Sequence, residues 1–162
     1  MEKIIQQNTE ASLILWLLAV ANDLKKNGDI LTARAGLTTQ QWLVLLHLHG
    51  DPNLPIWKGS DVPRPLGASE LAASLGVSRA YMTNLLAGLI QKKFVLQTED
   101  ATDKRRKILR LTDEGRNALE SLEPQRARAN SLLFDVFEPS ERLFFLEFLQ
   151  HCQQKLDNLE IR

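Results

Sequence analysis

Residues 68–95 read ASELAASLGVSRAYMTNLLAGLIQKKFV, and this segment carries the clearest structural signal in the chain. Its first part predicts a short helix that ends near Leu75, because Gly76 supplies a permissive turn. Ser78 is a good N-cap for a second helix that reaches about Lys92. Two short helices joined by a tight, glycine-containing turn are typical of a helix-turn-helix.

The second of these helices has two unlike faces. At 3.6 residues per turn, apolar side chains fall on one arc and short or polar side chains fall on another. The pattern indicates a helix that packs on one side and presents a slender polar surface on the other. The apolar arc holds Met82, Leu85, Leu86 and Leu89, and the polar arc holds Arg79, Ala80, Thr83, Asn84 and Ala87.

Two short strands should follow, at 94–99 (FVLQTE) and 107–111 (KILRL), because both segments are rich in aliphatic and β-branched residues. Between them begins a run of four basic residues, Lys104 to Lys107. Alone, such a run indicates a solvated surface, but here the strands place it at the tip of a β-hairpin. Residues 78–110 carry eight basic and three acidic side chains in a chain of zero net charge. A neutral protein can therefore present a basic face.

The order helix-turn-helix, strand, basic loop, strand is that of a winged helix. Residues 68–95, together with DATDKRRKILRLTDEG at 100–115, resemble the MarR family of bacterial transcription regulators. The second stretch matches the family's wing: an Asp, a basic pair, an alternating strand, then Leu-Thr-x-x-Gly. The chain departs from the family pattern at Lys93, where a Gly is frequent, and at Gln97, where an Arg is frequent.

The resemblance implies a mainly α fold with a small β-hairpin wing (α+β), in which residues 37–115 form the winged DNA-binding domain. Residues 1–36 and 116–162 would be the helical dimerisation region. It further implies a cytoplasmic homodimer that binds a near-palindromic operator on double-stranded DNA, with repression as the commoner behaviour in the family. The sequence adds a reason of its own, because the helices expected at 3–26 and 126–157 carry more apolar surface than one small domain can cover.

The same resemblance assigns roles to individual side chains. The N-terminal end of the second helix would enter the major groove, where Arg79 and Asn84 are expected to read bases, an Arg suiting guanine and an Asn adenine. In the wing, Arg105 aligns with the family's minor-groove arginine and Asp103 would orient it. The full expected DNA-binding set is Ser78, Arg79, Ala80, Thr83, Asn84, Asp103, Lys104, Arg105, Arg106 and Lys107.

The flanking segments predict further elements. A helix at 3–26 should end at Gly28, and another should run from Thr38 or Thr39 to Gly50. Residues 51–67, rich in proline and glycine, predict a loop that is longer than the family's usual connection. A helix should begin near Thr112 and be kinked or interrupted at Pro124.

Relatives in the family bind small aromatic or anionic effectors, so the resemblance also implies a ligand pocket between the dimerisation helices and the winged domain. Trp16, Trp42 and Trp57 are candidates to line it, and plain core packing is the alternative for each. For Trp57 the choice is between packing back on the domain and touching a ligand or partner.

Other chemistry is disfavoured. No nucleophile motif or phosphate-binding glycine loop is present, and the acids at 99–114 are interleaved with Arg and Lys, so we expect no enzyme and no cofactor. His47 and His49 point about 200° apart on a helix, so no metal site is expected. The single Cys152 should pack as a small apolar group, and the longest apolar window, Leu13 to Ala21, is too short to span a bilayer.

One alternative function remains open from the sequence, a winged helix whose basic hairpin docks on an acidic protein. A steep fall of duplex affinity with rising salt would distinguish DNA binding from it.

Overall fold

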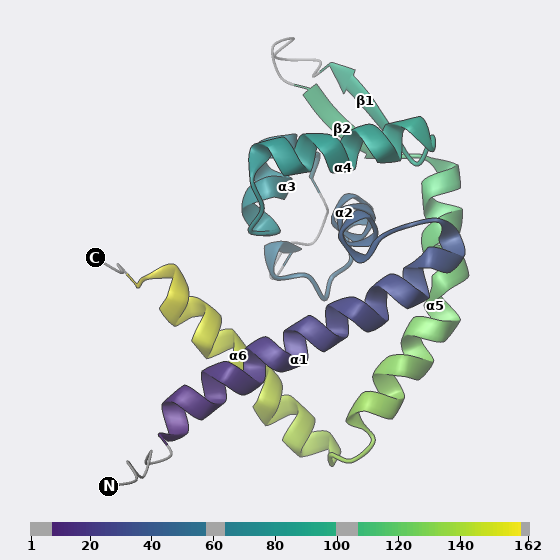
Figure 1. The fold of residues 1–162 in the computed structure, drawn as a ribbon. Helices are drawn as coiled ribbons and strands as arrows, with labels where there is room; N and C mark the ends of the chain where they lie inside the picture. The colour runs from purple at the N-terminus through teal and green to yellow at the C-terminus, as the bar shows by residue number, and fades with distance from the viewer. Residues whose placement is uncertain (1–7, 58–63, 100–106, 160–162) are drawn as a thin grey trace, which may run out of the picture. The chain divides into compact units, whose positions relative to one another are not determined.

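The computed structural model describes residues 8–57, 64–99 and 107–159, and these divide into two compact units, one ending at Glu123 and the other beginning at Pro124. Figure 1 shows the elements of both units. In chain order the helices and strands are α1 (Thr9–Thr32), η1 (Ala33–Ala35), α2 (Thr39–His49), η2 (Pro55–Trp57), α3 (Ala68–Ser74), α4 (Arg79–Gln91), β1 (Val95–Glu99), β2 (Lys107–Leu111), α5 (Asp113–Phe134) and α6 (Pro139–Asp157).

The first helix ends later than predicted, because Gly28 does not end it. α1 continues to Thr32, and η1 then ends at Gly36 in the left-handed conformation (φ 67°). A Cβ atom at Gly28 would lie 2.6 Å from the Thr39 Oγ1, so this glycine lets α1 approach the start of α2 closely. The prediction of a terminating Gly28 is therefore wrong, and close helix packing is the physical reason for the glycine.

The second helix has the predicted bounds. Thr38 accepts a hydrogen bond from the Gln41 N–H at 3.2 Å, and the Gln41 side chain accepts one from the Thr38 N–H at 3.3 Å, which is a capping box. Gly50 ends the helix with φ 81°. Val44 and Leu45 are fully buried, so α2 runs through the middle of the winged domain.

The two strands pair antiparallel with Val95 opposite Leu111 and Glu99 opposite Lys107. A third short segment joins them, because Leu66 forms a bridge with Leu109. Helices α2, α3 and α4 pack together with this small sheet, and the predicted apolar arc of α4 is buried in the shared core. The predicted winged helix-turn-helix is confirmed.

The 51–67 segment is predicted to be a loop, but part of it is helical. It includes η2, and Trp57 is only 5% exposed. The Trp57 indole N–H donates to the His47 carbonyl at 3.2 Å. Of the two alternatives for Trp57, packing back on the domain is the one observed.

The second unit contains the end of α5 and all of α6. α5 is not interrupted at Pro124, although proline removes one backbone donor there, and the boundary between the two units falls at this residue. No residue of α6 is buried, which leaves Cys152 exposed rather than packed as predicted. Within the described ranges, no helix is long and apolar enough to cross a membrane.

Candidate nucleic-acid interface

The recognition surface begins at the N-terminus of α4. The Ser78 hydroxyl oxygen accepts a hydrogen bond from the Tyr81 N–H at 3.2 Å and so caps the helix. The core-facing side chains are at most 7% exposed. The predicted DNA-binding side chains of this helix are all exposed, namely Ser78, Arg79, Ala80, Thr83 and Asn84.

The Thr83 hydroxyl forms a hydrogen bond within its own helix. The Thr83 hydroxyl donates to the Arg79 carbonyl, one turn back, at 2.9 Å. The hydroxyl hydrogen is therefore engaged within the helix, and the methyl group and the acceptor lone pairs of the oxygen are left for a partner. Methyl contact is how a protein recognises the C5 methyl of thymine in the major groove.

Tyr81 is an exposed aromatic residue on the same turn, and the sequence reasoning did not include it. Its side chain is 44% exposed beside the capped end of α4. The signal that could have found it is its i+3 spacing to Asn84, which places both residues on neighbouring parts of the exposed surface. A phenol hydroxyl there can donate to a phosphate oxygen or a base edge.

The wing starts from the paired strands β1 and β2. Lys107, the first residue of β2, is exposed and lies opposite Glu99 in the strand register. Asp103, Lys104, Arg105 and Arg106 lie outside the described residues, so their predicted roles in minor-groove and phosphate binding remain predictions.

The turn between α3 and α4 is fixed by backbone geometry. Gly76 has φ 62°, and the Val77 N–H donates to the Ala72 carbonyl at 3.0 Å, which completes a Schellman motif. His47 on α2 joins this unit, because its Nε2 lies 2.9 Å from the Ser74 hydroxyl and its Nδ1 lies 2.7 Å from the Leu43 carbonyl. His47 is therefore a satisfied core histidine.

The far end of α4 is tied to the corner between α1 and α2. The Lys92 ammonium donates to the Gly36 carbonyl and, at 3.2 Å, to the Gln41 Oε1. A Cβ atom at Gly88 would lie 2.8 Å from the Gln41 Nε2, so the absence of a side chain there makes room for Gln41. Lys92 thus helps to orient the recognition helix instead of adding a free charge to the basic face.

Lys93 occupies the position at which the family often has glycine, and the structure explains that preference. Among the described residues it is the only non-glycine with a positive φ, 61°. The Lys93 N–H donates to the Ile90 carbonyl and the Phe94 N–H to the Leu89 carbonyl, so Lys93 is the left-handed residue of a Schellman motif. The turn into the wing forms with lysine, at a conformational cost that glycine avoids.

The Leu-Thr-x-x-Gly pattern has a physical role at the start of α5. The Thr112 hydroxyl donates to the Lys93 carbonyl at 2.7 Å and accepts from the Gly115 N–H at 3.0 Å. A Cβ atom at Gly115 would lie 2.3 Å from the Phe94 carbonyl oxygen. The motif therefore holds α5 against the turn that leads into β1.

Asp29 fixes the end of α1 to the start of α2. Its Oδ1 accepts from the Thr39 N–H at 2.8 Å, and the Thr39 hydroxyl donates to the Lys25 carbonyl at 3.2 Å. The backbone hydrogen bond from Thr39 is the main reason that the pKa of Asp29 lies below its ordinary value, with a smaller contribution from the charge of Lys25.

The three tryptophans proposed for a ligand pocket lie in different environments. Trp16 on α1 is 71% exposed, Trp42 on α2 is half-buried, and Trp57 is in the core. For metal binding, no group of three or more His, Cys, Asp or Glu side chains is gathered anywhere in the described part of the chain.

Comparison with known proteins agrees with this geometry. The model of the MarR family matches residues 35–106. The chain is 32% identical to the transcriptional activatory protein BadR of Rhodopseudomonas palustris over 150 aligned residues. The alignment covers 90% of this chain and 81% of BadR. It is 31% identical over 91 residues to the transcriptional repressor YetL of Bacillus subtilis, covering 56% of this chain and 54% of YetL.

The chain also has the fold of the MepR protein in a solved S. aureus MepR–DNA complex. The TM-score is 0.70, the sequence identity is 20%, and the alignment covers 87% of this chain and 94% of the MepR chain. The capped recognition helix, the hairpin and these matches lead to one conclusion. The chain belongs to the MarR family of winged-helix, DNA-binding transcription regulators, which are not enzymes.

Proposed function

We propose that two copies of this chain pair through their terminal helices and bind a near-palindromic operator, with one α4 helix in each of two successive major grooves. The observation that carries this proposal is the outer surface of α4. It combines a capped N-terminus, small side chains that would let the helix approach the bases, and exposed Arg79 and Asn84, residue types that can pair with base edges.

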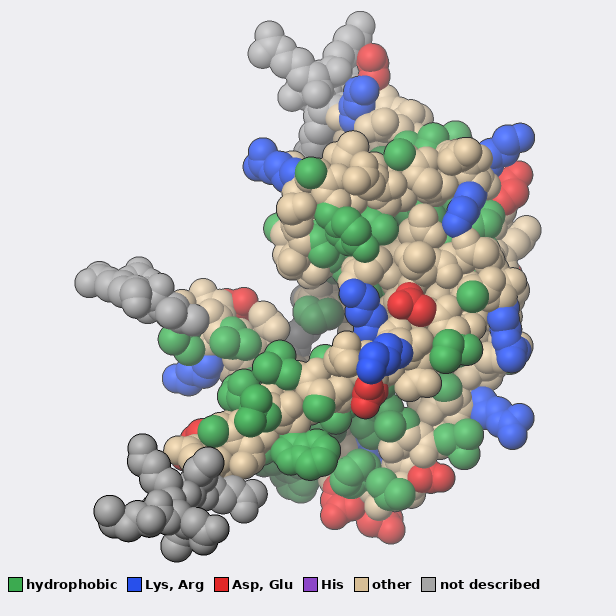
Figure 2. Space-filling view, viewed as in Figure 1, with side chains coloured by type: hydrophobic (Ala, Val, Ile, Leu, Met, Phe, Trp, Pro, Cys, Tyr) green, Lys and Arg blue, Asp and Glu red, His purple; other side chains and the backbone are tan. Residues whose placement is uncertain are grey.

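Pairing is supported by the apolar surface that each unit leaves exposed. On α1, Leu15 is 67% exposed and Trp16 71%. Apolar side chains gather along α1 in Figure 2. In the second unit, Val136, Leu143 and Phe148 are each more than 60% exposed. A monomer rarely exposes this much apolar surface, and a symmetric partner would cover it.

This proposal keeps residues 1–36 and 116–162 as the dimerisation region and residues 37–115 as the DNA-binding region. Half-sites would then lie about one helical turn apart, roughly 10 base pairs, because a dimer presents its two recognition helices to the same side of the duplex.

We take repression as the sign of regulation, because it is the commoner behaviour in the family that the chain resembles. Of the two relatives compared, YetL is named a repressor and BadR an activatory protein. A reporter fusion to the operator, measured with and without the chain, tests the sign directly. Higher expression without the chain would support repression, and lower expression would assign activation.

The test of DNA binding is the salt dependence of duplex affinity. We expect the affinity to fall steeply with salt, and Arg105→Ala to reduce the slope of log K against log salt by about one. Arg79→Ala should cost about 1–3 kcal/mol on the preferred site and relax the preference at one base pair. Arg34→Ala is a matched control, because Arg34 is an exposed arginine of η1 and belongs neither to α4 nor to the wing.

An equal loss on every sequence would show that Arg79 contacts only phosphate. Salt-insensitive or absent duplex binding would favour the alternative, in which the basic hairpin docks on an acidic protein.

A further inference from the structure

The recognition helix α4 is held at its C-terminal end as well as by its buried side. Lys92 is the C-cap residue of α4, and its N–H donates to the Gly88 carbonyl at 3.1 Å. The Schellman motif centred on Lys93 follows directly. The backbone from which the Lys92 side chain extends is therefore fixed by the end of the helix.

The Lys92 ammonium joins α4 to two other segments of the chain. It donates to the carbonyl of Gly36, the left-handed residue that ends η1, and to the Gln41 Oε1 at 3.2 Å. The Gln41 Oε1 also accepts from the Thr38 N–H in the capping box that starts α2. We call the contacts among Lys92, Gly36 and Gln41 the corner link, because they connect the last turn of α4 with the corner between α1 and α2.

The corner is in turn hydrogen-bonded to α1. The Asp29 carboxylate, near the end of α1, accepts from the Thr39 N–H at 2.8 Å. Helix α4 also approaches α2 closely here, because a Cβ atom at Gly88 would lie 2.8 Å from the Gln41 Nε2. A series of hydrogen bonds therefore runs from α1 through the start of α2 to the C-terminal end of α4.

The place of the corner link on α4 gives it leverage over the other end of the helix. Helix α4 has 13 residues, which makes it about 20 Å long at about 1.5 Å per residue. In Figure 1 its N-terminal end lies beside α3 and its C-terminal end leads to β1. A tilt of about 10° at the Lys92 end would move the N-terminal end by about 3.4 Å, which is the rise of one base pair. A small change of tilt therefore matters for where the helix reads DNA.

We propose that Lys92 is a positioning residue, which holds α4 at one angle to α1 and the start of α2 so that the dimer reads half-sites at one separation. This inference rests on the proposed function, in which α1 belongs to the dimerisation region and α4 enters the major groove. Apolar packing alone is non-directional, whereas hydrogen bonds to fixed acceptors favour one geometry. Without the ammonium group, more orientations of α4 would be populated.

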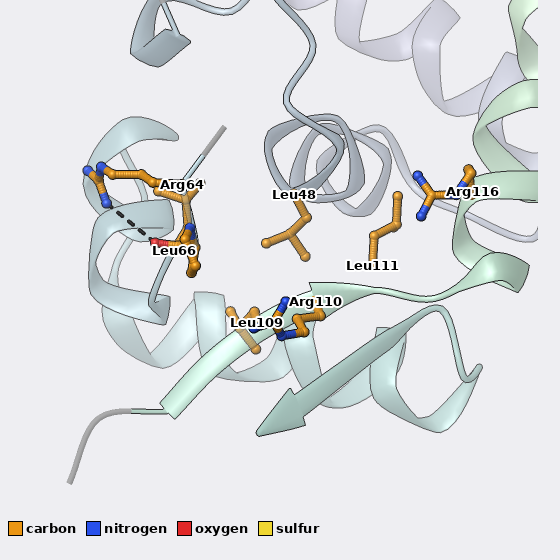
Figure 3. A pocket seen from close by; sticks show the side chains of 8 residues that line it. Leu48, Arg64, Leu66, Leu109, Arg110, Leu111 and Arg116 are labelled. Carbon is orange, nitrogen blue, oxygen red and sulfur yellow. Dashed lines mark hydrogen bonds between the residues drawn. The ribbon is translucent and has the colours of Figure 1, made fainter. Parts of the chain in front are cut away.

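The wing rests on the other end of α2, and this region supplies a control. Leu48, near the end of α2, lines a groove at the base of the wing together with Leu109 and Leu111 of β2 (Figure 3). Arg110 lines the same groove and is exposed. The variant Arg110→Gln removes one positive charge from the winged domain at a residue outside the corner link.

The test uses duplexes that carry the half-site selected by the wild-type protein, arranged as inverted repeats at separations from about 8 to about 13 base pairs. We expect the wild type to prefer one separation. Lys92→Met keeps an apolar stem and removes the ammonium donors. The preference for the best separation over one that is a base pair longer should fall by about two- to tenfold, the range that one hydrogen bond contributes. Base preferences within each half-site should not change.

Three further variants separate the hydrogen bonds from the charge. Lys92→Arg keeps donors on a long side chain and should keep the wild-type preference. Gly88→Ala leaves the Lys92 charge in place and favours the helix, but its Cβ displaces the Gln41 side chain, so it should broaden the preference as Lys92→Met does. Arg110→Gln should leave the preferred separation unchanged.

Three results would overturn the proposal. The first is an unchanged separation preference in Lys92→Met. The second is a uniform loss of affinity at every separation with the slope of log K against log salt reduced by about one, because Lys92 would then be a phosphate contact. The third is equal broadening by Lys92→Arg and Lys92→Met, because the donors would then not be the cause.

A measurement without DNA distinguishes failure of this inference from failure of the proposed function. Residual dipolar couplings of backbone amides report the orientation of α4 relative to α2 in the free protein. We expect Lys92→Met to change the couplings of residues 79–91 relative to those of residues 39–49, and Lys92→Arg to retain them. Unchanged couplings in Lys92→Met would overturn the positioning role. If the couplings change as expected but the wild type selects no inverted repeat, Lys92 still positions α4 and the proposed function fails.

Discussion

Replacing Thr83 separates two ways in which this side chain can read a base pair. Because the hydroxyl donates to the Arg79 carbonyl at 2.9 Å, we expect the methyl group to be the reading group, in contact with a thymine C5 methyl. Thr83→Val keeps a methyl group and removes the hydroxyl, whereas Thr83→Ser keeps the hydroxyl and removes the methyl. The two variants should therefore behave differently on the preferred operator.

The expected size follows from the area removed from water. Burying one methyl group contributes about 0.8 kcal/mol, and the contact buries parts of two, so Thr83→Ser should cost about 0.8–1.5 kcal/mol. This is about a four- to twelvefold loss of affinity. Thr83→Val should bind within about twofold of the wild type, because the Arg79 carbonyl keeps its backbone hydrogen bond within the helix.

The assay is competition binding at fixed salt, with each thymine of the half-site replaced in turn by uracil, which lacks the methyl. At one position, uracil should weaken the wild type and Thr83→Val alike and leave Thr83→Ser unchanged. The opposite order, in which Thr83→Val loses affinity and Thr83→Ser retains it, would show that the hydroxyl contacts the base and that the inference from the Arg79 hydrogen bond is wrong.

Three further predictions concern the scaffold. Lys93→Gly should raise the free energy of unfolding by about 0.5–1 kcal/mol in urea, because it relieves a left-handed lysine; a loss of stability would contradict the strain argument. Gly115→Ala should destabilise by about 1–3 kcal/mol or more, because its Cβ would meet the Phe94 carbonyl, and an unchanged urea midpoint would show that the backbone adjusts freely. Asp29→Asn should be less stable than the wild type near neutral pH. Since folding lowers the pKa of Asp29 below the ordinary value of an aspartate side chain, the stabilisation is present above that ordinary value and is lost as the pH falls through the lower folded value; a difference that is constant from pH 6 to pH 2.5 would refute the assignment.

The winged domain could be predicted because its signals are local. Ser78 caps α4, Gly76 adopts the left-handed turn, and the apolar spacing of α4 matches its buried side. Each of these depends on residues within one or two turns, so the sequence alone indicates them.

The misses depend on contacts between distant segments. The sequence predicts a helix end at Gly28, because a glycine shortly after two lysines is a common stop signal, but the glycine instead makes room for Thr39 of the next helix. The groove lined by Leu48, Leu66, Leu109, Leu111 and Arg116 forms only when segments far apart in the sequence come together, which no local pattern shows. The prediction that Cys152 packs as a small apolar group is wrong, because no residue of α6 is buried. Whether α6 is covered depends on assembly with other segments or chains, and the local sequence does not show this.

The most direct test of the proposed function is selection of the purified protein on a randomised duplex pool, in parallel with Arg79→Ala. We predict enrichment of an inverted repeat whose half-sites lie about one turn, roughly 10 base pairs, apart, with one position per half-site relaxed in the variant. Enrichment of no sequence, or of a single half-site without a symmetric partner, would contradict the dimeric operator-binding function proposed for this chain.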